Sequence, residues 1–327
     1  MISTCVGPSN AGMLSLNNRL FAMARQGRRQ PSALVAIVVT VVVLVVGIIV
    51  GQIAMRAAAG ALFSNVEPGR PIVDGAQELL DFSLHFLPIF FCLWAWLAFW
   101  AQRPFATLGF ERPRAATRFL AGALIGAMMM SVVASVLMVL PQTSLVHGEL
   151  WTLGGEAVAG STLALVGTII QSSGEEVLFR GWLLPALGAR YGPWPGVIGS
   201  SLLFGVAHVL NPNVTMLGLI NLSLFGMFLA FYALATQSLW GACAWHALWN
   251  WTDAAVFGFR DSGGPLHSAL LVSVNTSGPD LLTGGGFGPD GGLVETIVLS
   301  VGIAIVMVRL RVDAVNRHNN DVSSRSD

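Results

Sequence analysis

Residues 34–54 read LVAIVVTVVVLVVGIIVGQIA, a run with no charged side chain in which only Thr40 and Gln52 are polar. A transmembrane helix needs about 20 consecutive, mainly apolar residues. This run therefore predicts a helix that spans a membrane. Because the apolar core of a cleaved signal peptide is shorter, we interpret the run as a retained first helix.

The rest of the chain has the same character. Hydrophobic residues make up 54% of the 327 and charged residues only 10%, whereas soluble domains carry about 25% charged residues. Further apolar segments lie at 79–100, 117–140, 158–189, 194–210, 214–235, 239–257 and 292–309. The segment 158–189 is too long for one regular span, and 267–274 is too short to cross and is interpreted as an interfacial or re-entrant piece. We predict an all-α, polytopic transmembrane helical bundle with about eight membrane helices.

The arginines predict how the bundle is oriented. All 17 basic residues are arginines, and only Arg56, Arg70 and Arg260 lie in segments predicted on the side opposite the N-terminus. Positive residues accumulate on the cytoplasmic side of membrane proteins, so we expect a multi-pass protein of the cytoplasmic membrane with both termini in the cytoplasm. The formal net charge of zero argues against a nucleic-acid partner. The scattered cysteines, without a CxxC pair, predict neither disulfides nor a thiolate metal site.

These features divide the chain into six parts. We expect a mobile cytoplasmic arm (1–33), N-terminal transmembrane helices (34–156), a core that holds the polar motifs (157–257), a Gly/Pro-rich non-cytoplasmic loop (258–291), a last transmembrane helix (292–310) and a cytoplasmic tail (311–327).

Polar residues are concentrated in three of the predicted spans. They occur in QSSGEEVLFR at 171–180, in FGVAH at 204–208 and in HALWN at 246–250. Ionisable side chains inside a bilayer are costly and mark functional sites by default. A single membrane histidine such as His85 is better explained by a helix–helix hydrogen bond. Tryptophans near the last motif are expected to pack the bundle or to lie at the membrane–water interface: Trp240, Trp245, Trp249 and Trp251.

The two adjacent glutamates are predicted to have different roles. Glu176 precedes Arg180 by four residues, so the two side chains share a helix face and favour an ion pair. Glu175 is offset by about 100° from Glu176 on a helix with 3.6 residues per turn. It has no cation nearby in sequence. We therefore interpret Glu176–Arg180 as a structural pair and Glu175 as the carboxylate available for chemistry.

The expected depth in the membrane brings the motifs together. Residues 190–195 predict a turn; Glu175 lies 15 residues before Arg190, and His208 lies 15 residues after Pro193. At 1.5 Å per residue, both side chains lie about 22 Å from the turn and face each other at one level. Four-residue spacing also places Phe204 and His208 on one face, and His246 and Asn250 on another face.

This grouping predicts a hydrolytic site. A carboxylate and a histidine in a dry cavity can activate water, and a second histidine with an asparagine can stabilise an oxyanion. In order, Glu175-Glu176-xxx-Arg180, Phe204-xxx-His208 and His246-xxx-Asn250 resemble the motifs of the CPBP family. That family comprises type II CAAX prenyl proteases and bacteriocin-processing or self-immunity proteins.

The resemblance implies an intramembrane endopeptidase that acts on a membrane-associated peptide or protein. It implies that Glu175 and His208 activate the water, that His246 and Asn250 bind the oxyanion, and that no metal or other cofactor takes part. A zinc site formed by Glu175, His208 and His246 is an alternative, since three such ligands plus water suit catalytic zinc. Two alternative functions are a non-catalytic scaffold or immunity protein of the same family and a proton-coupled transporter, because buried Glu and His residues also build proton relays.

Overall fold

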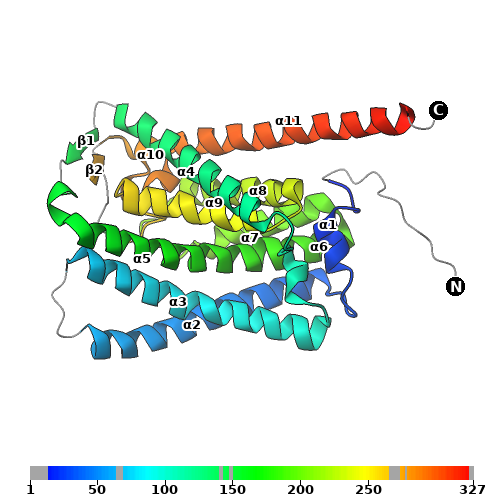
Figure 1. Cartoon of the computed structure of the whole chain (residues 1–327), viewed down its shortest axis with the longest axis horizontal. Coiled ribbons are helices and arrows are strands. Elements are labelled where there is room, and N and C mark those ends of the chain that lie inside the picture. Colours follow the sequence, from blue (N-terminus) through cyan, green and yellow to red (C-terminus); the bar gives the residue numbers. More distant parts are fainter. Residues whose placement is uncertain are drawn as a thin grey trace.

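The computed structural model describes residues 14–63, 69–139, 143–146, 150–264, 273–276 and 278–323, and it is predominantly helical (Figure 1). Each of the eight predicted spans coincides with a helical segment. The α-helices are α1 (Arg19–Ala24), α2 (Ala33–Leu62), α3 (Pro71–Ala95), α4 (Ala115–Val139), α5 (Leu150–Glu176), α6 (Leu184–Tyr191), α7 (Pro193–Ala207), α8 (Met216–Thr236), α9 (Trp240–Trp251), α10 (Asp280–Thr283) and α11 (Leu293–Ser323).

Shorter elements connect or extend these helices. Three segments are π-helical: η1 (Trp96–Ala101), η3 (Val177–Leu183) and η4 (Thr252–Val256). Three are 3₁₀ turns: η2 (Phe105–Leu108), η5 (Gly285–Phe287) and η6 (Pro289–Gly291). Strands β1 (Thr143–Val146) and β2 (Ser273–Thr276) pair antiparallel, with Thr143 opposite Thr276. This ladder was not expected, and the predicted piece at 267–274 lies outside the described residues except for its last two positions, which belong to β2.

The helix surfaces identify the chain as a membrane protein. On α2, one face is buried through Ala36, Val39 and Val43, whereas Val42 and Ile53 on another face are more than half exposed. Apolar side chains exposed in this way are suited to contact with lipid. Five helical segments among the described residues are long and apolar enough to cross a membrane: Ala33–Leu62, Pro71–Ala101, Ala115–Val139, Gly154–Tyr191 and Met216–Thr236. Helix α7 is apolar but shorter than these five segments. The eight membrane crossings therefore remain a prediction.

Glycines set the closest helix contacts. Helix α4 packs on α9, and α3 packs on both α2 and α5. A Cβ atom on Gly122 would lie 2.1 Å from the carbonyl oxygen of Gly241, and one on Gly126 would lie 2.2 Å from that of Trp245. Small residues four apart allow membrane helices to approach at backbone distance. The α4–α9 contact therefore fixes the position of the helix that carries the last motif.

The N-terminal arm, expected to be mobile, contains a helix that packs on the bundle, and its mobility stays a prediction. The side chains of Leu20 and Phe21 in α1 are fully buried, and α1 packs against α6 and η2. A hydrogen bond from Asn18 Nδ2 to the carbonyl oxygen of Leu234 (2.9 Å) ties the arm to α8. Buried apolar side chains offset the entropy of ordering a short segment.

His85 also differs from its predicted role. Its Nδ1 atom lies 2.8 Å from the carbonyl oxygen of Asp81, so the bond forms within α3 rather than between helices. The spacing of four residues explains this, because the carbonyl one turn earlier is the nearest acceptor. The tryptophans, by contrast, pack the bundle as expected: Trp245 and Trp249 are buried, and Trp251 donates to the carbonyl oxygen of Ser161 at 2.9 Å.

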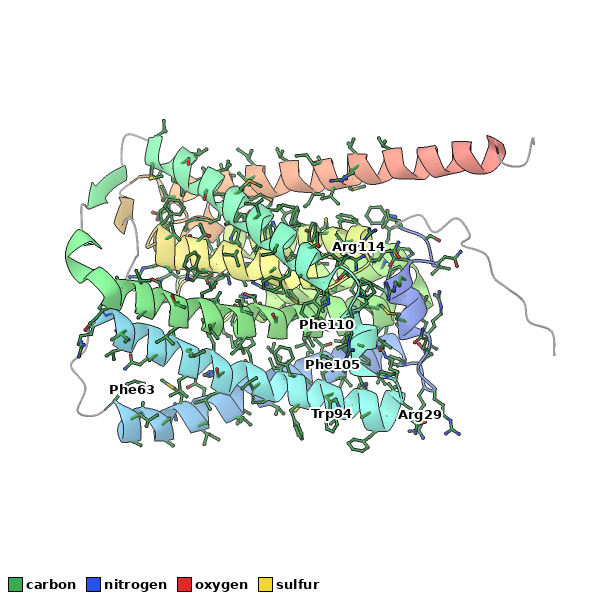
Figure 2. All side chains as sticks on the ribbon, in the orientation of Figure 1. Arg29, Phe63, Trp94, Phe105, Phe110 and Arg114 are labelled. Carbon is green, nitrogen blue, oxygen red and sulfur yellow. The ribbon has the colours of Figure 1, made fainter. Side chains whose placement is uncertain are left out.

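The two described ends of the chain lie at the same end of the bundle. Figure 1 shows α1 and the C-terminal end of α11 at one end, and the β1–β2 ladder with α10 at the other. In Figure 2, Arg29 lies at the end with α1, and Phe63 lies at the opposite end. The side of the membrane on which these ends lie stays a prediction.

Candidate active site

The first motif lies where α5 changes into a π-helix. Glu175 and Glu176 are the last residues of α5, and η3 begins at the next residue. A π-helical turn inside a helix is rare and is frequent at functional sites. Arg180, within η3, is fully buried and donates from Nη1 to Glu176 Oε1 at 2.8 Å. The predicted Glu176–Arg180 ion pair is confirmed.

The arginine also contacts the second motif. Its guanidinium carbon lies 4.2 Å from the centroid of the Phe204 ring, a distance at which the ring face attracts a cation. Phe204 in turn stacks on Phe225 of α8, with the ring centroids 5.9 Å apart. Arg180 is therefore held between a carboxylate and an aromatic face, which fixes η3 against α7.

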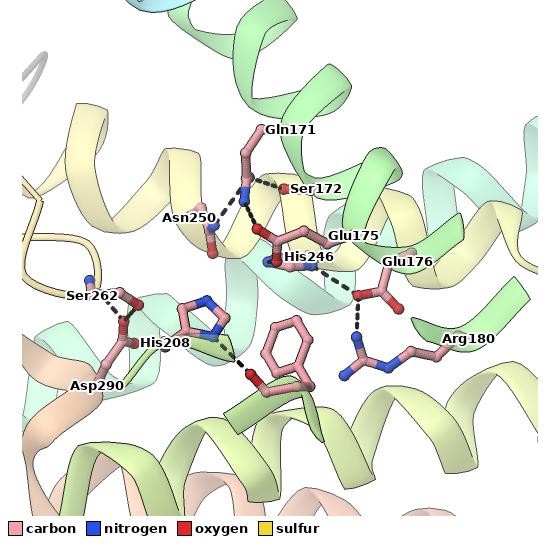
Figure 3. Close-up of polar contacts among 11 residues, drawn as sticks. Gln171, Ser172, Glu175, Glu176, Arg180, His208, His246, Asn250, Ser262 and Asp290 are labelled. Carbon is pink, nitrogen blue, oxygen red and sulfur yellow. Dashed lines mark hydrogen bonds and ion pairs between the residues drawn. The ribbon is translucent and has the colours of Figure 1, made fainter. Parts of the chain in front are cut away.

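Glu176 has a second partner that the sequence did not predict. The Nδ1 atom of His246 lies 2.9 Å from Glu176 Oε1, the same oxygen that accepts from Arg180 (Figure 3). The interpretation of Glu176–Arg180 as an isolated structural pair is therefore incomplete. Glu176 links the first motif to the third, on α9.

Glu175 points in another direction, as its helical offset predicted. Its Oε1 atom accepts from Gln171 Nε2 at 2.7 Å. Its Oε2 atom has no hydrogen-bond partner among the described residues and lies 3.9 Å from His246 Nε2. The residue is only 8% exposed, yet it lines a cavity of about 650 Å³. Glu175 thus lines the cavity and keeps one buried carboxylate oxygen without a hydrogen-bond partner among the described residues.

Gln171 is a site residue to which the sequence assigned no role. Besides donating to Glu175, it accepts from Ser172 Oγ at 2.8 Å and from Asn250 Nδ2 at 3.5 Å. These contacts orient the Glu175 carboxylate relative to the third motif (Figure 3). Its position one helical turn before Glu175, inside a predicted span, is the signal that could have identified it.

His208 lies at the end of α7 and opens onto the same cavity. Its Nδ1 atom is 2.8 Å from the carbonyl oxygen of Phe204, which leaves Nε2 for a ligand. The structure brings the four predicted site residues together, because all of them line this cavity: Glu175, His208, His246 and Asn250. The histidine that contacts Glu175 is, however, His246, with Nε2 3.9 Å from Oε2. The two helices of the expected hairpin, α6 and α7, meet at Gly192 as predicted.

The comparison with known families concerns this part of the chain. Residues 158–252 match the model of the type II CAAX prenyl endopeptidase Rce1-like family. The matched segment holds an Rce1-like domain. It contains all three motifs, lies within residues 157–257 and covers less than a third of the chain. No curated protein and no solved structure matches the chain. The match supports a membrane peptidase of the CAAX protease type.

A loop outside the Rce1-like domain completes the cavity. Asp261, Ser262 and Asp290 line it together with the three motifs, and Asp290 Oδ2 accepts from the backbone N–H of Ser262 at 2.9 Å. Figure 3 shows Asp290 and Ser262 on the His208 side of the site. The local sequence of this Gly/Pro-rich loop does not predict that it lies at the cavity, because tertiary contacts bring the loop back to the bundle.

The zinc alternative is not assembled in the Rce1-like domain. Across the described ranges, no group of three or more His, Cys, Asp and Glu side chains is close enough to hold a metal ion. Glu175, His208 and His246 share the cavity but do not form such a group. The carboxylate, imidazole and amide side chains of the site instead form hydrogen bonds with one another.

Proposed function

We propose that the protein is an intramembrane endopeptidase that hydrolyses a peptide bond of a membrane-associated peptide or protein. The observation that carries the proposal is the Glu175 carboxylate. Its Oε2 atom is buried without a hydrogen-bond partner among the described residues and lies 3.9 Å from His246 Nε2, and the residue lines the cavity. A buried acceptor of this kind suits a water molecule, and the match to a peptidase family supports the reaction class.

Water activation is assigned to Glu175 and His208. Glu175 takes a proton from the water as the water oxygen attacks the carbonyl carbon of the scissile bond. His208 offers Nε2 to the same water, since its Nδ1 is engaged by the carbonyl oxygen of Phe204. When the C–N bond breaks, Glu175 returns the proton to the departing amine and is regenerated. No covalent intermediate is needed.

Oxyanion stabilisation is assigned to His246 and Asn250. The Asn250 amide lies on the cavity wall beside Gln171. The Nδ1–H group of His246 donates to Glu176, so Nε2 donates to an oxyanion only when the ring carries both protons. Donors preorganised around the developing charge stabilise the transition state more than the bound substrate.

The charged side chains of the site lie next to one another. Arg180 pairs with Glu176 at 2.8 Å, and both nitrogens of His246 face a carboxylate, Glu176 at 2.9 Å and Glu175 at 3.9 Å. Buried charges are tolerated when they are paired and hydrogen-bonded.

The proposal includes the setting of the enzyme. The arginine distribution favours the cytoplasmic membrane, with both termini in the cytoplasm. The partners are the lipid bilayer and a membrane-associated substrate, with no nucleic acid. Catalysis is assigned to the side chains described above, without a metal or other cofactor.

A cleavage assay tests the reaction. Purified protein in lipid nanodiscs is incubated with a library of membrane-anchored peptides in H₂¹⁸O, and the products are analysed by mass spectrometry. We expect two fragments whose masses sum to the substrate plus one water, with one ¹⁸O atom in the new carboxylate. Tight peptide binding without any cleavage would contradict the proposal and favour the non-catalytic scaffold.

A further inference from the structure

The cavity extends far beyond the proposed catalytic residues. Along α5 it is lined from Glu175 back to Gly160, and along α3 from Phe86 back to Pro71. At 1.5 Å per residue, either wall is about 22 Å long. The cavity therefore runs from the proposed catalytic carboxylate towards the end of the bundle where α3 begins. Its length suits an extended polypeptide segment better than a compact small molecule.

One wall of this cavity is acidic. Asp74, Glu78 and Asp81 all line it, and their spacing of four and three residues places them on one face of α3. The three side chains are partly buried. The carboxylates form a row that leads from the outer end of the cavity towards its centre.

The opposite wall is also lined by acidic residues. Asp261 and Asp290 line the cavity from the loop that follows η4 and from η6. Burial raises the pKa of Asp261, and the carboxylate of Asp290 raises it further. Glu175 and Glu78 add to this effect, which means that carboxylates from both walls act on one another across the cavity.

The imbalance of charge is large. Of the 17 acidic residues in the chain, six line the cavity: Asp74, Glu78, Asp81, Glu175, Asp261 and Asp290. None of the 17 arginines is among the described residues that line it. A cleft lined by one sign of charge between low-dielectric walls focuses the field and concentrates ligands of opposite sign. The apolar side chains of Leu44 and Ile48 on α2 supply such a wall.

We propose that the cavity binds a polypeptide segment that carries Arg or Lys side chains, placing these beside Asp74, Glu78 and Asp81 while the backbone reaches Glu175. This inference rests on the proposed endopeptidase activity, because it names the class of substrate for the same site. The basic side chains lie on the part of the substrate that occupies the α3 wall.

Binding tests the inference separately from cleavage. Three fluorescent peptides of equal length, which differ only in having Arg, Gln or Glu at the same positions, are titrated against protein in zwitterionic nanodiscs. The protein carries Glu175→Gln so that no peptide is consumed. Attraction between partly screened charges favours the Arg peptide, and we expect it to bind more tightly than the Gln peptide, by up to about tenfold. Salt should reduce this preference.

Charge-neutral variants locate the effect. In the same background, Asp74→Asn/Glu78→Gln/Asp81→Asn should remove the preference for the Arg peptide while leaving affinity for the Gln peptide nearly unchanged. The control is Glu156→Gln/Asp280→Asn, which removes acidic side chains that do not line the cavity and should keep the preference. Asp81→Asn alone, checked by its melting temperature, gives a partial effect if the triple variant does not fold.

The outcomes separate the two proposals. Equal affinity for all three peptides, or an equal loss in the triple variant and the control, would overturn the charge inference even if the wild-type protein cleaves peptides. Arg-selective binding that disappears in the triple variant would support it even if no peptide is cleaved. In that case only the endopeptidase proposal would fall.

Discussion

His246 Nδ1 and Glu176 Oε1 lie 2.9 Å apart, and the same glutamate oxygen accepts from Arg180. This contact joins the first and third motifs, which are 70 residues apart in the chain. Because Nδ1 is hydrogen-bonded to Glu176, the nitrogen of His246 that faces Glu175 is Nε2. Glu176 thus orients a proposed catalytic histidine in addition to pairing with Arg180.

Glu176→Gln should destabilise the protein strongly. The substitution leaves the fully buried Arg180 without a carboxylate partner, and breaking a buried ion pair from one side costs about 3–5 kcal/mol. It also weakens the hydrogen bond that orients His246, because an amide oxygen is a weaker acceptor than a carboxylate oxygen. We expect a lowered melting temperature and weaker cleavage, measured by thermal unfolding and by the peptide assay.

A matched control lies on the same helix. Glu156 pairs with Arg70 at the surface, where both side chains are about half exposed (44% and 50%). Surface pairs are worth about 0–1 kcal/mol, so Glu156→Gln should melt close to the wild type. A Glu176→Gln protein as stable as this control would show that the buried pair does not support the fold.

Gly126→Ala should disturb the site from a distance. A Cβ atom at this position would lie 2.2 Å from the carbonyl oxygen of Trp245, so α9 would have to move, and His246 moves with it. The cost of such overpacking is about 1–3 kcal/mol. Gly60→Ala on α2 meets no atom within 4 Å and should be neutral or slightly stabilising. Equal melting temperatures and equal activity for the two variants would contradict the close α4–α9 contact.

Chelation should leave activity in place. If Glu175 and the surrounding donors activate water and bind the oxyanion, prolonged treatment with a chelator should not change the cleavage rate. Elemental analysis should find substoichiometric zinc in the active protein. Stoichiometric zinc, with activity lost on its removal and restored on its return, would support the alternative site and contradict the metal-free assignment.

Binding of the Arg peptide should weaken as the pH falls. Burial and the nearby Asp290 carboxylate raise the pKa of Asp261 above the usual aspartate range, and the carboxylates of Glu175 and Glu78 also contribute. Asp261 therefore loses its negative charge on acidification sooner than an ordinary aspartate, and the attraction for cations falls with it. Titrations at several pH values should show this loss of affinity. In Asp261→Asn, the affinity should depend less on pH at the higher end of the pH range. An affinity that rises on acidification would contradict the assignment.

Features set by local helix geometry could be predicted from the sequence. Apolar runs located all eight helical segments, and the four-residue spacing identified the Glu176–Arg180 pair. The offset between adjacent residues on a helix explains why Glu175 turns away from that pair. Each of these predictions needs only the period of one helix and the chemistry of the side chains on it.

Features that depend on how helices meet could not be predicted in this way. The His246–Glu176 contact requires the distance between α5 and α9, which packing at glycines such as Gly126 determines. The loop that brings Asp290 to the cavity and the docking of α1 against α6 are also tertiary contacts. Neither has a local sequence pattern, because loops and short amphipathic segments are positioned by what they pack against.

The central claim is that Glu175 is the general base, and the most direct test compares Glu175→Gln with wild type in the same preparation. Glutamine keeps the shape and can still accept the hydrogen bond from Gln171, so the melting temperature and peptide affinity should remain close to wild type. Turnover should fall by about a hundredfold to ten-thousandfold, the usual contribution of a general base. A stable Glu175→Gln protein that cleaves peptide at the wild-type rate would contradict the account.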